Sequence, residues 1–279
     1  MMEVIRAAAA GACYGVQRAL DMAFTAAGDA GTVESLGPLI HNPQVVGELA
    51  DKGIRVIDDP GDAAGDTVII RSHGVGPADR RALASTGVGI VDATCPHVLR
   101  AQKAAVKLAE EIGTVIVVGD PEHPEVDAIR EYAEEAGGSV RVVDSPEAIP
   151  DDIPRRVGVV VQTTQNRVVF EQVLAALEAR GIEPTVKDTI CSATAKRQSA
   201  ARDLAAHVDA MVVIGGHNSS NTTRLYEICK AMCPKTYHIE TIGELDASCF
   251  AGCATVGITA GASTPEAQIV PVQEYLERL

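Results

Sequence analysis

The sequence predicts an α/β fold built from three similar units with mostly parallel sheets. Two observations predict it. Short β-branched runs recur along the chain, and each is followed by small or polar residues and then by a helical pattern. A segment of the form strand, cysteine, helix also occurs three times, about 90 residues apart. No glycine-serine linker or charge run separates the three units, so we expect them to be packed rather than tethered.

The expected strands cover residues 67–71, 114–118, 157–161, 210–214 and 254–258. Each is a nearly continuous apolar run, which is typical of a parallel sheet covered by helices on both faces. The segments that follow are polar or small: Ser-His-Gly, Gly-Asp-Pro, Gln-Thr-Thr, Gly-Gly-His and Thr-Ala-Gly-Ala-Ser. Ligands bind beyond the carboxyl ends of parallel strands. We therefore expect the functional site in these segments.

The three repeated segments contain Cys13, Cys95 and Cys191. They predict a first α/β unit over residues 14–95, a second over 96–190 and a third over 191–279, which the N-terminal strand in 1–13 completes. Each unit would offer one cysteine near the start of a helix. Three such units predict three thiolates arranged around a pseudo-threefold axis.

Composition excludes several classes of protein. The chain has 24 basic and 38 acidic residues, a net charge of −14, and aromatic residues make up only 3% of it. Such a chain is a poor binder of nucleic acid, because it lacks both positive charge and stacking surfaces. No apolar run approaches the roughly 20 residues that span a bilayer. The N-terminus lacks the pattern of a signal peptide, so we expect a cytoplasmic protein with no membrane partner.

The chemistry of three converging cysteines is restricted. A helix N-terminus favours a thiolate over a thiol, because its N–H groups and dipole stabilise negative charge. Three thiolates without a fourth ligand would leave one metal position open, which in a cubane iron–sulfur cluster is one iron free to bind substrate. Cys95 is also followed by Pro96, as in some cluster proteins. The alternative is three buried cysteines that bind nothing.

Further polar residues stand where strands are expected to end. These are His41, His73 and His123, the run from Gly216 to Asn221, and the run from Thr259 to Ser263. Hydroxyls, an amide and main-chain N–H groups at the start of a helix suit an anion. Any one of these segments alone is typical of an ordinary turn or helix cap. Together with three cysteines they predict a diphosphate pocket beside a redox metal.

These motifs resemble those of the 4-hydroxy-3-methylbut-2-enyl diphosphate reductase family, which catalyses the last step of the methylerythritol phosphate route to isoprenoids. The resemblance covers nearly the whole chain. It is carried by Cys-x-Gly-Val-x-Arg-Ala from Cys13, Leu-Gly-Pro-Leu-Ile-His-Asn, Arg-Ser-His-Gly-Val, Asp-Ala-Thr-Cys-Pro, His-Pro-Glu-Val, Gln-Thr-Thr-Gln, Ile-Cys-Ser-Ala-Thr, Asn-Ser-Ser-Asn and Thr-Ala-Gly-Ala-Ser-Thr-Pro. It implies three α/β units arranged as a trefoil around one [4Fe–4S] cluster, which can be isolated as [3Fe–4S].

The resemblance also implies roles for individual residues. Cys13, Cys95 and Cys191 match the cluster ligands, and Glu125 matches the proton donor. His123 and Thr163 match residues that hydrogen-bond around Glu125 and the substrate hydroxyl, so they count as both catalytic and substrate-binding. The remaining substrate-binding residues match the diphosphate set: His41, His73, Ser219, Ser220, Asn221 and Ser263. The implied reaction is a two-electron reductive dehydroxylation to isopentenyl and dimethylallyl diphosphate, with ferredoxin or flavodoxin as electron donor.

Two departures from the family keep alternatives open. Ala12 stands where many members have phenylalanine, and Ala128 where many have glycine. These two residues are the only support for a second hypothesis, a paralogue that reduces another allylic alcohol. A non-catalytic iron–sulfur or zinc redox sensor is the third hypothesis. Four more cysteines, which lie at i, i+4 spacing in two pairs, could supply a zinc site or be structural thiols: Cys229, Cys233, Cys249 and Cys253.

Overall fold

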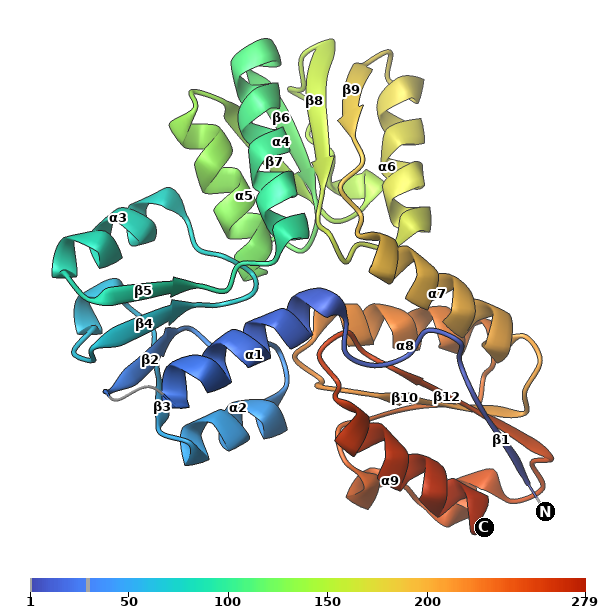
Figure 1. The fold of residues 1–279 in the computed structure, drawn as a ribbon. Helices are drawn as coiled ribbons and strands as arrows, with labels where there is room; N and C mark the ends of the chain where they lie inside the picture. Colours follow the sequence, from blue (N-terminus) through green and yellow to red (C-terminus); the bar gives the residue numbers. More distant parts are fainter. Residues whose placement is uncertain (1, 29–30) are drawn as a thin grey trace. The chain divides into compact units, whose positions relative to one another are not determined.

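A computed structural model describes residues 2–28 and 31–279, and in them the chain forms three parallel sheets of four strands each (Figure 1). The predicted α/β class with three sheet-containing parts is confirmed. The chain divides into two compact units. One holds the chain up to Val16 together with His41–Pro43 and Ser192–Leu279, and the other holds Gln17–Ile40 and Gln44–Cys191. The boundaries predicted at 95/96 and 190/191 stay predictions.

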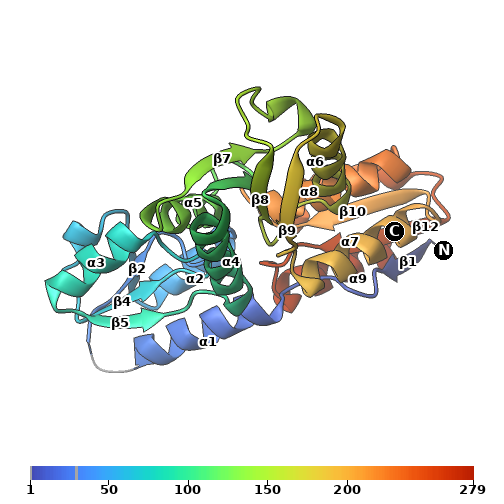
Figure 2. The same ribbon diagram turned by 90° about the horizontal axis from the view of Figure 1, so that it is seen from above.

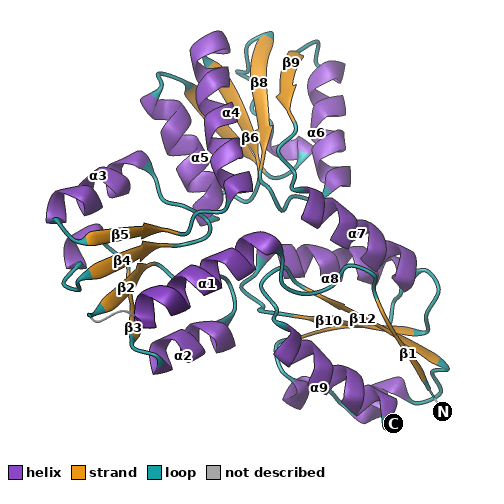
Figure 3. Ribbon diagram, viewed as in Figure 1, coloured by secondary structure: helices purple, strands orange, loops and turns teal. Residues whose placement is uncertain are grey.

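The N-terminal sheet has the strand order β3-β2-β4-β5. Helix α3 lies on one of its faces and α1 and α2 on the other (Figure 3). The elements are α1 (Tyr14–Gly28), β2 (Val33–Leu36), α2 (Pro43–Asp51), β3 (Ile54–Ile57), β4 (Thr67–Ile70), α3 (Pro77–Thr86) and β5 (Gly89–Asp92). Residues 29–30, which the first predicted unit includes, lie outside the described residues.

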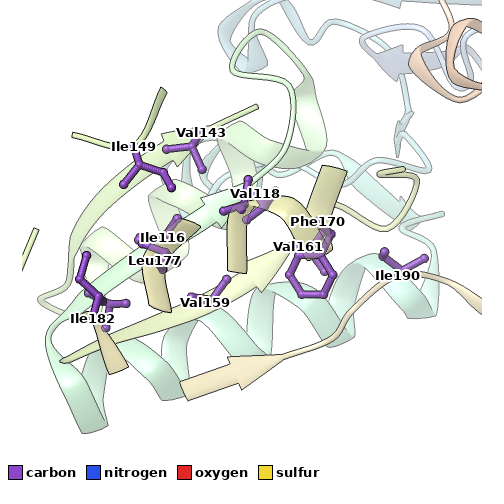
Figure 4. Packing of buried hydrophobic residues seen from close by; sticks show 12 residues of the cluster. Ile116, Val118, Val143, Ile149, Val159, Val161, Phe170, Leu177, Ile182 and Ile190 are labelled. Carbon is purple, nitrogen blue, oxygen red and sulfur yellow. The ribbon is translucent and has the colours of Figure 1, made fainter. Parts of the chain in front are cut away.

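The central sheet has the equivalent order β7-β6-β8-β9, with α4 and α5 side by side on one face and α6 on the other (Figures 1 and 2). Its elements are α4 (Pro96–Ile112), β6 (Thr114–Val118), α5 (Pro124–Glu135), β7 (Ser139–Val143), β8 (Arg156–Val161), α6 (Arg167–Ala179) and β9 (Glu183–Lys187). Alternate residues of β6 and β8 pack on opposite faces. Ile116, Val159 and Phe170 lie in the core on the α6 face (Figure 4), and Val115, Val117 and Val160 in the core on the other.

The C-terminal sheet has the order β1-β12-β10-β11, so its fourth strand comes from the other end of the sequence. Val4 of β1 pairs with Val256 of β12. The elements are β1 (Glu3–Arg6), α7 (Ser192–Ala205), β10 (Ala210–Ile214), α8 (Ser220–Met232), β11 (Thr236–Ile239), β12 (Thr255–Ala260) and α9 (Glu266–Glu277). The predicted last strand ended at residue 258, but β12 continues because Thr259 and Ala260 pair with Val213 and Ile214.

The three sheets share a structural detail that makes them equivalent. A glycine follows the first strand of each sheet, and its N–H donates to the carbonyl that ends the neighbouring strand. The bonds are Gly37 to Ile57 at 2.7 Å, Gly119 to Val143 at 2.9 Å and Gly215 to Ile239 at 2.9 Å. A Cβ at 119 would lie 2.7 Å from Val126 Cγ2, and one at 215 would lie 2.6 Å from Thr264 Oγ1. Any other side chain would therefore push these loops away from the sheet.

This strand order creates one topological switch point in each sheet. The first and third strands lie side by side, and the connections that leave them run in different directions. Their carboxyl ends are level, with Leu36 paired to Ile70, Val118 to Val161 and Ile214 to Ala260. Ligands of open parallel sheets bind at such points. Among the described residues, no helix combines the length and apolar character needed to cross a bilayer.

The four extra cysteines lie in two separate hydrophobic cores of the C-terminal sheet. Cys229 and Cys233 pack with Met211 and Val213, whereas Cys249 and Cys253 pack in the core that contains Val212 and Ile214. Successive residues of a strand point to opposite faces, so the two pairs contact opposite faces of the sheet. This arrangement favours structural thiols over one zinc site made by all four.

Cys229 is expected to resist alkylation in the folded protein. Burial raises the pKa of its thiol to about 12, and only the thiolate reacts. Iodoacetamide near pH 8 should leave Cys229 unmodified until denaturant is added, while the partly buried Cys253 reacts in the folded chain; peptide mass spectrometry measures both. Equal labelling of the two before denaturation would contradict this expectation.

Candidate active site

The three candidate ligand cysteines occupy equivalent positions, each relative to the sheet whose loop its N–H contacts. Each comes directly before a helix: Cys13 before α1, Cys95 as N-cap of α4 and Cys191 before α7. Each N–H donates to a carbonyl two residues beyond the end of the third strand. These bonds are Cys13 to Ala262 at 3.1 Å, Cys95 to Ser72 at 2.9 Å and Cys191 to Thr163 at 2.9 Å. Among the described residues, the seven cysteines form no disulfide.

Glu125 is a buried carboxylate at the switch point of the central sheet. Its side chain is 1% exposed, although it lies in the first turn of α5. Oε1 accepts the main-chain N–H of Thr163 at 2.6 Å, and Oε2 accepts the Thr163 hydroxyl at 2.8 Å. The carbonyl of the same Thr163 receives the N–H of Cys191. One residue thus connects the buried acid to the loop that carries a cysteine.

Two histidines lie beside this carboxylate in the same compact unit. His123 is the N-cap of α5, and its Nδ1 accepts the N–H of Glu125 at 3.1 Å. Accepting this bond means that Nδ1 carries no proton, so Nε2 holds the proton of a neutral ring. The ring of His73, which follows β4, meets the ring of His123 edge-on with centroids 5.2 Å apart. These contacts link Glu125 to Thr163 and His123, and His123 to His73, within one compact unit.

The other compact unit contains an anion-binding type of helix start. Ser219 is the N-cap of α8, and its hydroxyl oxygen accepts the N–H of Thr222. A hydroxyl that accepts this bond can still donate its own hydrogen, and a helix N-terminus favours negative charge. Within the described part of the chain, the buried Nδ2 of Asn221 has no hydrogen-bond partner. A buried amide donor without an acceptor is unfavourable, so this position fits an anionic ligand.

His41 and Ser263 lie together in that same unit. The Ser263 hydroxyl donates to the His41 carbonyl at 3.0 Å, and Asn42 Nδ2 donates to the Ser263 carbonyl at 2.8 Å. The His41 carbonyl also lies 3.0 Å from the place a Cβ would take on Gly216. The segment after β2 is therefore fixed against both polar loops of the C-terminal sheet. Its partners in this unit include Ser263, the loop before Ser219 and Gln268, whose side-chain oxygen accepts from Asn42 Nδ2 at 2.9 Å.

His238 supports the loop between β10 and α8. Its Nε2 donates to the Gly215 carbonyl at 2.9 Å. The centroid of its ring lies 4.4 Å from the centroid of the His217 ring. Burial lowers the pKa of His238, an effect that neighbouring His217 reinforces, while the bond to Gly215 and the carboxylates of Glu240 and Glu244 oppose it. The folded chain thus favours the neutral ring.

Stability is therefore expected to fall as the pH drops below about 6.5, the ordinary histidine pKa, because the unfolded chain then binds a proton that folded His238 resists. His238→Gln should show a smaller decrease in melting temperature between pH 7.5 and pH 5.5 than the wild type, whereas the exposed His207→Gln should match the wild type. A His238→Gln protein with the full wild-type decrease would contradict this assignment.

Some structurally important residues were not predicted. Arg18, Arg100 and Arg197 donate to main-chain carbonyls near the candidate ligands, and His238 was not singled out. A signal did exist for the arginines, since each follows a cysteine by five or six residues. Of the two departures from the family pattern, Ala12 is exposed and Ala128 is buried on α5, one turn after Glu125.

Comparison with known proteins identifies the family. A family model described as LytB protein matches residues 4–277. The chain belongs to the LytB family. The resemblance predicted from the motifs is thereby confirmed.

Curated relatives of this LytB-family chain are reductases by name. The chain is 48% identical over 281 residues to a protein of Geobacter sulfurreducens, covering 100% of this chain and 97% of the relative. It is 47% identical over 280 residues to one of Trichlorobacter lovleyi, covering 100% and 99%. Both are named 4-hydroxy-3-methylbut-2-enyl diphosphate reductase.

Solved structures agree with the LytB-family assignment. One, described as (E)-4-hydroxy-3-methyl-but-2-enyl diphosphate reductase, is 42% identical with a TM-score of 0.72, and the match covers 100% of both chains. A second, E-1-hydroxy-2-methyl-but-2-enyl-4-diphosphate reductase from Plasmodium falciparum, has a TM-score of 0.91 over 100% of this chain and 88% of that one. At 24% identity the second likeness shows the fold alone.

Proposed function

We propose that this chain reduces 4-hydroxy-3-methylbut-2-enyl diphosphate to isopentenyl and dimethylallyl diphosphate. In this reaction the C–O bond of an allylic alcohol breaks, two electrons and two protons are consumed, and the oxygen leaves as water. The observation that carries the proposal is the buried Glu125 carboxylate, held by both oxygens on Thr163, whose carbonyl in turn anchors Cys191. This arrangement supports Glu125 as a proton source that is connected through one residue to a candidate metal ligand.

The donor set fits an iron–sulfur cofactor, which membership of the family implies. We propose that Cys13, Cys95 and Cys191 hold one [4Fe–4S] cluster, which can also be isolated as [3Fe–4S]. Support comes from their equivalent positions at helix starts, where the N–H groups and dipole stabilise thiolates. A cluster held by three thiolates leaves one iron without a protein ligand. When bound, the cluster supplies electrons and a Lewis-acidic iron.

The polar loops suit the substrate's diphosphate. We assign it to His41, His73, Ser219, Ser220, Asn221 and Ser263. The hydroxyls, the amide and the N-terminus of α8 donate hydrogen bonds to phosphate oxygens, and the histidines add charge when they are protonated. The buried Asn221 amide supports this role, because an anion would give it the acceptor that the described chain does not.

Glu125 is assigned as the proton donor. Its protonated carboxyl would pass a proton to the leaving hydroxyl, so that water departs instead of hydroxide. Thr163 fixes the carboxyl in one orientation through its N–H and hydroxyl. His123 caps the helix that carries Glu125, and its Nε2–H can donate to the substrate hydroxyl. These roles make Glu125, His123 and Thr163 the catalytic group.

The two other functions that the sequence allowed are less well supported. A redox sensor needs neither a buried proton donor nor an anion-binding loop. A paralogue for another allylic alcohol rests on Ala12 and Ala128 alone, and the relatives over the full chain carry the reductase name. We further propose a cytoplasmic location and ferredoxin or flavodoxin as the electron donor, with no nucleic-acid or membrane partner.

The test is anaerobic turnover. Protein reconstituted with iron and sulfide is supplied with the diphosphate substrate and reduced methyl viologen, and products are identified by mass spectrometry. The proposal predicts both isopentenyl and dimethylallyl diphosphate. Absence of either product from protein that contains the cluster would contradict it. Stronger inhibition by a different allylic diphosphate alcohol, together with faster turnover of that compound, would favour the paralogue.

A further inference from the structure

An arginine follows each candidate ligand on the helix that the cysteine precedes. Arg18 and Arg100 come five residues after Cys13 and Cys95, and Arg197 comes six after Cys191. Each guanidinium donates to a main-chain carbonyl one or two residues before the next cysteine. The bonds are Arg18 Nη1 to Thr94 O at 3.3 Å, Arg100 Nη2 to Thr189 O at 3.4 Å, and Arg197 Nη2 to Gly11 O at 2.8 Å. The series is cyclic, since the third bond returns to the segment before Cys13.

These bonds restrain backbone that is already anchored on its other side. The N–H of every candidate ligand donates to the loop beyond the third strand of its sheet. The arginine fixes the carbonyl just before it. Two such anchors hold the main chain on both sides of each cysteine, which fixes the position of its Cα and the direction of its Cα–Cβ bond. This is the preorganisation that a metal ligand needs.

Two of the three segments have a further restraint of the same design. Asp92 Oδ1 accepts the N–H of Thr94 at 3.0 Å, and its other oxygen accepts from Arg80 at 2.8 Å. Asp188 Oδ1 accepts the N–H of Ile190 at 3.1 Å, and its other oxygen accepts from Arg167 at 2.6 Å. Both aspartates stand three residues before a candidate ligand. The repetition indicates that these loops are built to be rigid.

The burial of Arg197 adds an electrostatic consequence. Arg197 is 5% exposed, whereas Arg100 is exposed and Arg18 half-buried. A guanidinium keeps its charge in nearly all protein settings, and a buried charge acts on its surroundings with little screening. Positive charge near thiolates stabilises both the thiolates and any additional electron placed on the group they bind.

We propose that Arg18, Arg100 and Arg197 are positioning residues that fix the three cysteine loops, and that the charge of Arg197 raises the reduction potential of the bound cluster. The effect on potential rests on the proposed function. The restraint on the backbone does not, because it is a property of the chain without a cofactor. The two parts can therefore be tested separately.

The first readout is amide hydrogen exchange in the metal-free protein. Arg197→Met should speed exchange of the Cys13 N–H by about tenfold or more, because local opening becomes easier. Lys196→Met, an exposed neighbour on α7, is the matched control and should leave that exchange unchanged. Unchanged exchange in Arg197→Met, or equal acceleration in both variants, would overturn the positioning role. If Arg197→Met does not fold, Arg100→Met with Lys103→Met as control applies the same test to the Cys191 N–H.

The second readout is the midpoint potential of the reconstituted cluster. Arg197→Met should lower the equilibrium constant for one-electron reduction about tenfold, which lowers the midpoint potential by about 59 mV. Arg197→Lys keeps the charge, so its midpoint potential should stay near that of the wild type. An unchanged potential in a fully loaded Arg197→Met protein would overturn the electrostatic role. A wild-type chain that takes up no cluster would contradict the proposed function, yet the exchange measurement would still decide the positioning role.

Discussion

Replacing Glu125 by glutamine is expected to reduce turnover about 10²- to 10⁴-fold, the usual contribution of a general acid. Glutamine has nearly the same shape, so its carbonyl oxygen can still accept the N–H of Thr163. Its amide cannot deliver a proton to the leaving hydroxyl. Cluster content and substrate binding should therefore remain close to wild type. Steady-state kinetics and iron analysis on the same preparation measure both.

The control for this variant is Glu122→Gln. Glu122 lies three residues earlier and is exposed, and it makes no side-chain hydrogen bond among those described. It tests whether loss of one negative charge near α5 is enough to affect turnover. Wild-type activity in Glu125→Gln would remove this residue from the mechanism. An equal loss in both variants would assign the effect to charge instead of proton transfer.

Replacing Cys95 by serine is expected to abolish turnover and most of the bound iron. A serine hydroxyl remains protonated near neutral pH and is a poor iron ligand. Serine is at the same time a favourable N-cap, so α4 should still begin at Pro96 and the chain should still fold. Iron content and circular dichroism together distinguish loss of the ligand from loss of the fold.

Because the three cysteines occupy equivalent positions, the same prediction applies to Cys13 and Cys191. Cys13→Ser and Cys191→Ser should lose iron to a similar degree, since each cysteine has the same main-chain anchor in its sheet. Cys253→Ser is the matched control and should retain it. Full iron content in any one of the three ligand variants would show that the ligand set is wrong.

Much of the fold could be predicted because its signal is local. Apolar strands such as 114–118 and 210–214 are short continuous runs, and β6 and β10 have these bounds. The polar segments after the strands could be identified for the same reason. The family resemblance then implied that Thr163 hydrogen-bonds around Glu125, and the two residues are 38 positions apart. That pairing depends on β6 and β8 being neighbours with level carboxyl ends.

Contacts between segments far apart in the sequence could not be predicted from local patterns. Arg197 donates to Gly11, which is 186 positions away, and an arginine on a helix surface carries no sign of its acceptor. The acceptors are carbonyls, which every residue has, so no particular residue type marks them. The role of His238 was not predicted because the sequence of β11 is that of an ordinary edge strand. The two extra cysteine pairs lie on opposite faces of the C-terminal sheet. This placement could not be predicted, because it depends on strand alternation and on how the helices pack.

The most direct test of the account is the content of iron, zinc and acid-labile sulfide per chain after strictly anaerobic purification. The account predicts about three to four irons with matching sulfide, as for a [3Fe–4S] or [4Fe–4S] cluster. Zinc alone, or no metal even after reconstitution with iron and sulfide, would leave the proposed reductase without a source of electrons and would contradict it.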